Sequence, residues 1–246
     1  MAVATPSPTD YLAPMTAWPA AIFFDFDGVI VNSEPLHFAA IREVLKREQI
    51  DLQEEEYYRE LIGFDDRGAF AHMFAKHKRP LDPKTMLRVL TRKSETSREL
   101  IESRQYAALP GVEELVRGLW RNYPLAICSG ALREEIESML EGVNLRDCFP
   151  VIVAAEDVTK GKPDPEGYLL AAELVRQKTG LRFSPADCLV IEDAPTVIKS
   201  VNAAGFHTLA VATSHPLEEL AHAKWRVTRL TPTQVLKQIP NLKIGV

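Results

Sequence analysis

The chain has 246 residues, 46% of them hydrophobic, and a formal net charge of −5. This length suits one large domain or one domain with an insertion. The basic residues are scattered, which argues against a nucleic-acid surface, and no apolar run approaches the roughly 20 residues that a membrane-spanning helix needs. We therefore expect a cytoplasmic protein without a nucleic-acid or membrane partner.

The N-terminal segment, residues 1–20, is rich in proline and lacks the cationic start and apolar middle of a signal peptide, so we expect a flexible tail. Cys128, Cys148 and Cys188 have neither paired nor metal-ligand spacing, and each lies among apolar residues. They are expected to be buried, reduced thiols.

Five short apolar runs follow the tail and read as strands covered on both faces, because they are continuous rather than alternating. They are Ala21–Phe24, Leu125–Cys128, Val151–Ala154, Cys188–Ile191 and Thr208–Val211. Helical patterns separate the later runs, at Val112–Trp120, Arg133–Leu140, Glu166–Val175 and Thr196–Ala204. This alternation predicts an α/β fold with a doubly wound, mostly parallel sheet.

One stretch, residues 36–108, interrupts the alternation with helical segments alone. We expect amphipathic helices around Glu54–Glu56, Arg67–His77 and Thr85–Ile101. The predicted organisation is an α/β core of residues 21–35 and 109–246 with an inserted helical cap of residues 36–108. Such a cap would cover the carboxyl edge of the sheet, where open α/β sheets bind ligands.

Four polar clusters each follow an expected strand. Asp25-Phe26-Asp27-Gly28 ends the first strand, and Ser129-Gly130 follows the second. Lys162 stands in a proline-rich turn before a helix, and Glu192-Asp193 follows the fourth apolar run. Singly, each cluster is open to a plainer interpretation: a solvated turn, a capping serine, a loop lysine, or an acidic helix start.

Together the four clusters resemble the motifs of the haloacid dehalogenase superfamily, in its branch with a helical cap after the first motif. The run from Asp25 to His37 is similar to that of small sugar-phosphate phosphatases, phosphoglycolate phosphatases and β-phosphoglucomutase. The resemblance implies a Mg²⁺-dependent phosphohydrolase that acts on a small phosphorylated metabolite. Monomers are common in this branch, so a monomer is expected.

The resemblance also implies residue roles. Asp25 corresponds to the nucleophile that forms an aspartyl-phosphate, and Asp27 to the general acid and base. Ser129 and Lys162 correspond to groups that hold the phosphoryl oxygens. The Mg²⁺ ligands would come from Asp25, the carbonyl of Asp27 and Asp193, with Glu192 as a neighbour in the metal site.

Two positions depart from the pattern. The fourth motif usually carries a small hydroxyl residue after its acidic pair and a glycine three residues further on, whereas this chain has Ala194 and Val197. Neither corresponds to a catalytic group, so the departures bear on helix packing.

The second aspartate, Asp27, argues against a dehalogenase, which has no leaving alcohol to protonate.

Candidate substrate-binding residues lie in and beside the cap. They are Gly130, His37, Gly63, Arg67 and Lys93, with Phe64 as a further specificity candidate. His37 lies ten residues after Asp27, where the mutases also carry a histidine, and Lys93 resembles a cap lysine that contacts substrate. A partly buried helix residue and a solvated lysine are the plain alternatives for these two.

Two other functions stay open. A phosphoryl-transferring mutase is disfavoured because Asp66 stands where the mutases have an arginine, and Leu132 and Arg133 stand where they have a lysine and an asparagine. A non-catalytic phosphometabolite-binding protein is disfavoured because Asp25, Asp27, Lys162 and Asp193 are all present.

Overall fold

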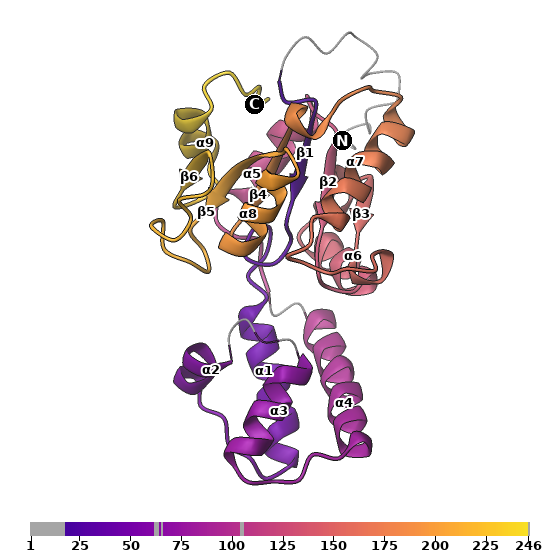
Figure 1. Ribbon diagram of the computed structural model, residues 1–246, viewed down its shortest axis with the longest axis vertical. Coiled ribbons are helices and arrows are strands. Elements are labelled where there is room, and N and C mark those ends of the chain that lie inside the picture. Colours follow the sequence, from indigo (N-terminus) through magenta and orange to yellow (C-terminus); the bar gives the residue numbers. More distant parts are fainter. Residues whose placement is uncertain (1–17, 62–63, 65, 104–105, 246) are drawn as a thin grey trace. The chain divides into compact units, whose positions relative to one another are not determined.

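The chain forms two compact units. A computed structural model describes residues 18–61, 64, 66–103 and 106–245. The core unit consists of the chain up to Asn32 and from Ala107 onward, and the helical unit of Ser33–Tyr106 (Figure 1). Each unit has its own hydrophobic core.

The core unit is built on a six-stranded sheet with the order β3-β2-β1-β4-β5-β6. All neighbouring strands are parallel, and β1, which leads to Asp25, lies between β2 and β4. The strands are β1 (Ala21–Phe24), β2 (Leu125–Cys128), β3 (Val151–Val153), β4 (Cys188–Glu192), β5 (His207–Val211) and β6 (Trp225–Val227). Because helices cover both faces, the central strands are apolar at successive positions and buried throughout.

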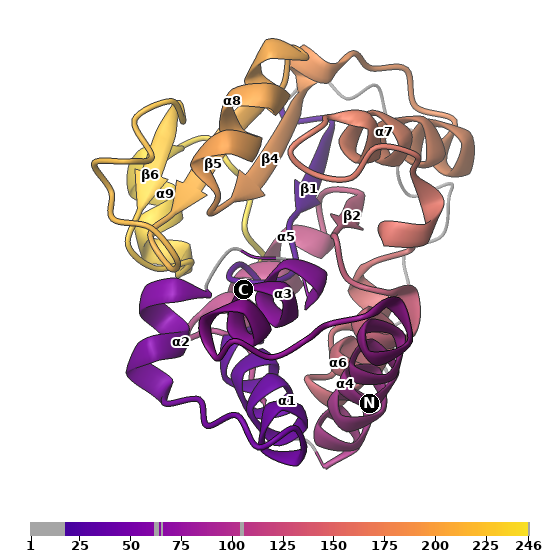
Figure 2. The ribbon, with the colours of Figure 1, turned by 60° about the horizontal axis from the view of Figure 1, so that its bottom comes forward.

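Helices flank this sheet on both sides (Figure 2). They are α5 (Val112–Trp120), α6 (Arg133–Gly142), α7 (Glu166–Thr179), α8 (Pro195–Ala203) and α9 (Pro232–Gln238). On one face, Tyr168 and Val175 of α7 and Val201 of α8 pack against alternate strand residues such as Phe23 and Val190. The ring of Phe24, on the other face, meets Phe149 edge-on at 5.5 Å between centroids.

The helical unit contains α1 (Glu34–Arg47), α2 (Glu54–Glu60), α3 (Asp66–Lys76) and α4 (Pro83–Glu102). The longest of these, α4, begins where the carboxylate of Asp82 accepts the backbone N–H of Thr85, a normal N-cap. Its buried positions recur every fourth residue, at Val89, Lys93, Ser97 and Ile101. Two of the four are polar, so the buried stripe of α4 is not a purely hydrophobic one.

The two chain segments that join the units are paired with each other inside the core unit. Val31 and Ala108 form an antiparallel bridge, and the backbone N–H of Leu109 donates to the carbonyl of Ile30 over 2.9 Å. The insertion therefore leaves and re-enters the core unit at one place.

The expected α/β fold with a parallel sheet is confirmed, and the first two predicted strands have the observed bounds. Sequence reasoning missed β6 and α9. β6 has only three residues, and its central Arg226 is exposed, so it carries little of the apolar signal that marks the other strands. The predicted tail lies largely in residues 1–17, outside the described part of the chain.

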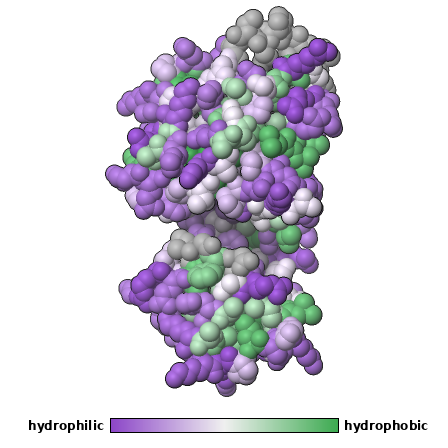
Figure 3. Space-filling view, in the orientation of Figure 1, coloured by the Kyte–Doolittle hydropathy of each residue, from purple (hydrophilic) through white to green (hydrophobic). Residues whose placement is uncertain are grey.

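All three cysteines are buried and free, as expected. Burial raises the pKa of Cys128 and Cys188 to about 12 and that of Cys148 to about 11, so the thiols stay protonated at neutral pH. On the face seen in Figure 3, hydrophilic residues cover most of the surface of each unit. Among the described helices, none is both long and apolar enough to cross a bilayer.

Replacing Phe149 by Ala should destabilise the core unit by about 3–5 kcal/mol, because a fully buried ring and its contact with Phe24 are lost. Chemical denaturation measures this change. Leu169→Ala is the matched control in the same unit: its side chain is 42% exposed, and we expect a change within about 0.5 kcal/mol. Equal effects of the two substitutions would contradict the packing described here.

Candidate active site

The two aspartates of the first motif follow β1 directly. The backbone N–H of Asp25 donates to the carbonyl of Ile191 on β4 (2.9 Å), which fixes the end of the strand. A tight turn then begins, in which the carbonyl of Phe26 accepts the N–H groups of Val29, Ile30 and Val31. Asp25 is buried, whereas Asp27 is half-buried.

Gly28 allows the turn to pass close to Asp193. Its φ is +75°, in the left-handed region that favours glycine. A Cβ atom at this position would lie 2.1 Å from Oδ2 of Asp193, which is far too close for any side chain. Because Gly28 has no side chain, the turn after β1 can lie against Asp193, the residue that follows β4.

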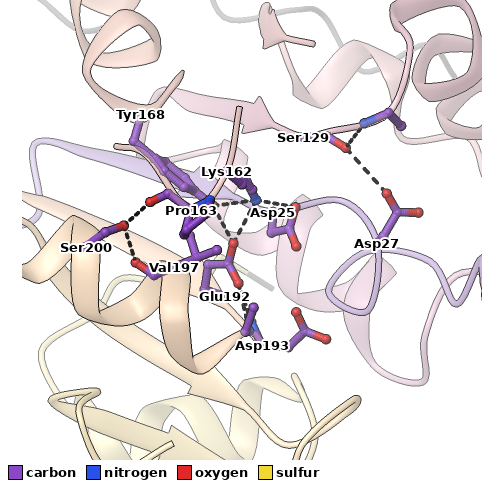
Figure 4. Close-up of polar contacts among 12 residues, drawn as sticks. Asp25, Asp27, Ser129, Lys162, Pro163, Tyr168, Glu192, Asp193, Val197 and Ser200 are labelled. Atoms are coloured by element: carbon purple, nitrogen blue, oxygen red, sulfur yellow. Dashed lines mark hydrogen bonds and ion pairs between the residues drawn. The ribbon is translucent and has the colours of Figure 1, made fainter. Parts of the chain in front are cut away.

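Ser129 follows β2 and lies beside Asp27. Its hydroxyl donates to Oδ2 of Asp27 at 3.4 Å and accepts the backbone N–H of Ala131 at 3.0 Å. The Ser129 hydroxyl therefore holds the turn after β2 and lies beside the second aspartate (Figure 4). It is not the cap of α6, whose N-cap residue is Leu132.

Lys162 extends from the loop before α7 into the space between Asp25 and Glu192 (Figure 4). Its Nζ donates to Oδ1 of Asp25 at 2.6 Å, to Oε1 of Glu192 at 2.7 Å and to the hydroxyl of Tyr168 at 3.2 Å. The loop is fixed from behind, because the hydroxyl of Ser200 on α8 donates to the carbonyl of Pro163. All three donor positions of the ammonium group are thus used.

Glu192 is fully buried, and both of its oxygens are engaged. Oε1 accepts from Lys162 and from the hydroxyl of Tyr168 (3.2 Å), and Oε2 accepts the backbone N–H groups of Asp193 and Ala194 (both 2.9 Å). Four donors satisfy this carboxylate, which is what burial of a charged group requires.

Charge is unevenly distributed in this site. Burial disfavours the ammonium form of Lys162, but the carboxylates of Asp25 and Glu192 outweigh it and hold the pKa of Lys162 above its usual value. Burial raises the pKa of Asp25, against the opposing charge of Lys162. Burial and the charge of Glu192 raise the pKa of Asp193 to about 6. Three buried carboxylates share one ammonium group, so the site has an excess of negative charge.

A divalent cation would balance this excess of negative charge. Asp25, Glu192 and Asp193 each offer an oxygen atom, and the three atoms lie within 4.8 Å of one another. Carboxylate oxygens are the ligands that Mg²⁺ prefers. The donor chemistry and the surplus charge both suit such an ion, and Asp25 and Asp193 are less saturated with hydrogen bonds than Glu192.

The structure brings together the predicted residues of the core unit: Asp25, Asp27, Ser129, Lys162, Glu192 and Asp193. Gly130, the next residue after Ser129, is exposed, and a side chain there would meet open space. Sequence reasoning did not identify Tyr168 or Ser214, whose hydroxyl donates to Oδ2 of Asp193. Tyr168 stands in an apolar helix pattern and Ser214 in a polar loop, so neither carried a distinguishing signal.

The other predicted residues belong to the helical unit. Nζ of Lys93 lies 3.1 Å from Nδ1 of His37 and 3.0 Å from Oδ2 of Asp66, and Lys93 is only 5% exposed. Lys93 is thus a buried, paired lysine rather than a solvated one. Arg67 and Phe64 are exposed, and Gly63 lies outside the described residues.

Most of the chain, residues 22–211, matches the family model described as haloacid dehalogenase-like hydrolase. A phosphatase of Arabidopsis thaliana that acts on 5-amino-6-(5-phospho-D-ribitylamino)uracil is 29% identical over 228 residues, covering 89% of this chain and 56% of that protein. This chain therefore spans little more than half of that relative. The fructose-1-phosphate phosphatase YqaB of Escherichia coli is 31% identical over 194 residues, covering 78% of this chain and 96% of that protein.

A β-phosphoglucomutase of Bacillus subtilis is also similar, at 27% identity over 228 residues, with 85% of this chain and 97% of that protein covered. Among solved structures, a mutant of CbbY from Rhodobacter sphaeroides in complex with xylulose 1,5-bisphosphate has a TM-score of 0.73. It is 23% identical and covers 92% of this chain and 99% of that chain. This structural match supports the fold.

Gly28→Ala should destabilise the protein by about 1–3 kcal/mol, because the backbone is left-handed there and the new Cβ collides with Asp193. Thermal or chemical unfolding measures this change. Gly161→Ala serves as the control, since a Cβ at Gly161 meets nothing within 4 Å and its effect should stay within about 0.5 kcal/mol. A neutral Gly28→Ala substitution would contradict the close approach.

Proposed function

The chain belongs to the haloacid dehalogenase-like hydrolase family, and we propose that it is a Mg²⁺-dependent phosphatase of a small phosphate monoester that works through an aspartyl-phosphate on Asp25. The observation that carries this proposal is the contact of 2.6 Å between Asp25 and the buried ammonium group of Lys162, beside a second aspartate and an acidic pair. This arrangement supplies a nucleophile, an acid and base, and cationic compensation in one place.

In the first proposed step, Asp25 attacks the phosphorus atom and the bond from phosphorus to the leaving oxygen breaks. Asp27 gives its proton to that oxygen, so the alcohol leaves neutral. A water molecule then attacks the phosphorus of the aspartyl-phosphate, Asp27 takes a proton from it, and the bond to Asp25 breaks to release inorganic phosphate. The half-exposed position of Asp27, beside Ser129, suits a group that exchanges protons with both an alcohol and a water.

Charge compensation is the main requirement of this reaction, since a carboxylate must meet a phosphate dianion. Lys162 is already held on Asp25, where it offsets that repulsion. We propose that Mg²⁺, when bound, supplies the remaining compensation and is held by Asp25, Asp193 and the backbone carbonyl of Asp27. The Glu192 carboxylate already accepts hydrogen bonds from four donors. We therefore propose that Glu192 positions Lys162 beside the metal site.

The substrate class that we propose is a sugar phosphate or a similarly small phosphorylated metabolite, as the names of relatives indicate. Substrate binding by Gly130, His37, Gly63, Arg67 and Lys93 stays a prediction, as does the role of the helical unit as a cap. A cytoplasmic location and a monomeric state likewise stay predictions.

The mutase alternative is less well supported. Asp66, which stands where the mutases have an arginine, forms an ion pair with Lys93. Arg133, at another differing position, is bound to Asp157 and to the carbonyl of Ile152. At these positions the chain lacks the side chains that the mutases carry, and this difference favours hydrolysis of a monophosphate over turnover of a sugar bisphosphate.

Asp25→Asn should lower phosphate release by at least about 10³-fold, because a neutral amide replaces the carboxylate that Lys162 orients and that we propose as the nucleophile. Rapid quenching of the wild-type enzyme followed by mass spectrometry should place a labile phosphate on the peptide that contains Asp25. Asp51→Asn, at an exposed position of the helical unit, is the control and should leave turnover unchanged. A fully active Asp25→Asn enzyme, or a phosphate on a different peptide, would overturn the proposed mechanism.

Hydrolysis and phosphoryl transfer can be separated with β-glucose 1-phosphate and Mg²⁺, with and without a trace of glucose 1,6-bisphosphate. A phosphatase admits water to its aspartyl-phosphate, so we expect steady release of inorganic phosphate that needs no bisphosphate. Chromatography of the sugar products gives the competing rate. Glucose 6-phosphate that forms faster than free phosphate would make the enzyme a mutase.

A further inference from the structure

Asp193 is confined on one side by the turn after β1. Its Oδ2 occupies the space that a side chain at residue 28 would fill, so the backbone of Gly28 limits the positions open to this oxygen. The same virtual Cβ would lie 3.0 Å from Oγ of Ser214. Gly28, Asp193 and Ser214 therefore meet at one point.

Ser214 reaches this point from the loop after β5. In the sheet register, Glu192 at the end of β4 pairs with Ala210 of β5, so the loops that follow these strands are neighbours. The N–H of Ala212 donates to the carbonyl of Val227, and the N–H of Thr213 donates to the carbonyl of Val211, both over 3.0 Å. These bonds fix the start of the loop, and the hydroxyl of Ser214 donates to Oδ2 of Asp193.

The hydroxyl group that contacts Asp193 comes from a residue outside the fourth motif. The residue directly after the acidic pair, where the resembling family usually has a small hydroxyl residue, is Ala194, which cannot donate from its side chain. Ser214, twenty-one residues beyond Asp193, instead supplies the hydroxyl that donates to Asp193. Among the described residues, Oδ1 of Asp193 accepts no hydrogen bond, so one oxygen is held and the other is available.

We propose that Ser214 is a positioning residue of the metal site, which holds Oδ2 of Asp193 so that Oδ1 is presented to a divalent cation. This inference rests on the proposed role of Asp193 as a Mg²⁺ ligand. Loss of a hydrogen-bond partner that orients a metal ligand typically weakens metal binding by about 10–100-fold, because the free carboxylate must then be ordered when the metal binds.

The test measures Mg²⁺ binding by isothermal titration calorimetry, without substrate, for a pair of variants that differ only in the hydroxyl. Ser214→Thr keeps the donor, and Ser214→Val has nearly the same shape without it. We expect Ser214→Val to weaken Mg²⁺ binding by about 10-fold or more and Ser214→Thr to stay within about 3-fold of the wild type. Thr213→Ala is the matched control, since it removes a neighbouring exposed hydroxyl that does not contact Asp193.

Kinetics supply a second readout. With Ser214→Val, the Mg²⁺ concentration for half-maximal phosphate release should rise, while the rate at saturating Mg²⁺ stays close to that of the wild type. The melting temperature in EDTA should match that of the wild type, because the loop is exposed and is held by backbone bonds. If the substitution only destabilised the fold, it would lower this melting temperature and leave the Mg²⁺ affinity unchanged.

Asp193→Asn distinguishes the two levels of the inference. If Asp193→Asn weakens Mg²⁺ binding and Ser214→Val does not, the positioning role of Ser214 is wrong and the proposed metal site stands. If the wild type binds no Mg²⁺, or if Asp193→Asn binds Mg²⁺ as tightly as the wild type does, the metal assignment itself fails. Loss of affinity in Ser214→Thr equal to that in Ser214→Val would also overturn the proposal, since the hydroxyl would then be irrelevant.

Discussion

The organisation of the site depends on the burial of one positive charge, the ammonium group of Lys162. A lysine in this position must have anionic partners, because an unpaired charge in a protein interior costs several kcal/mol. Asp25 and Glu192 provide them from two neighbouring strands, and Tyr168 contributes a hydroxyl from α7. The same contacts that stabilise the buried lysine also orient Asp25, the carboxylate that we propose as the nucleophile.

The parallel sheet explains why these groups meet. Strands β1, β2 and β4 all run in the same direction, so Asp25, Ser129 and Asp193 emerge at one edge although they are separated by up to 168 positions of sequence numbering. Backbone bonds then refine the arrangement, as in the pairing of the Asp25 N–H with Ile191 and the pairing of the Glu192 carboxylate with two N–H groups of its own chain. The sheet sets the neighbourhood of each residue, and local hydrogen bonds set its direction.

The parts of the structure that were predictable from sequence are those encoded by local pattern. Continuous apolar runs marked β1 and β2 with their observed bounds, and the polar residues directly after the strands marked the site. Contacts between distant segments were not encoded locally. The burial of Lys93 depends on His37 and Asp66 in other helices, and a charged helix sequence alone suggests a solvated lysine. The role of Gly28 in admitting Asp193 likewise depends on the spacing of two loops, which no single segment records.

The pairing of Val31 with Ala108 makes the insertion a closed excursion from the core unit. For the sheet, the 74 residues of Ser33–Tyr106 count as one long connection whose two ends are already tied together. Loop-closure entropy grows only slowly with length, so a different module of similar end spacing could stand in the same place at little thermodynamic expense. The fold thus separates two evolutionary problems: the chemistry at the strand ends can stay constant while the inserted module is replaced, shortened or elaborated.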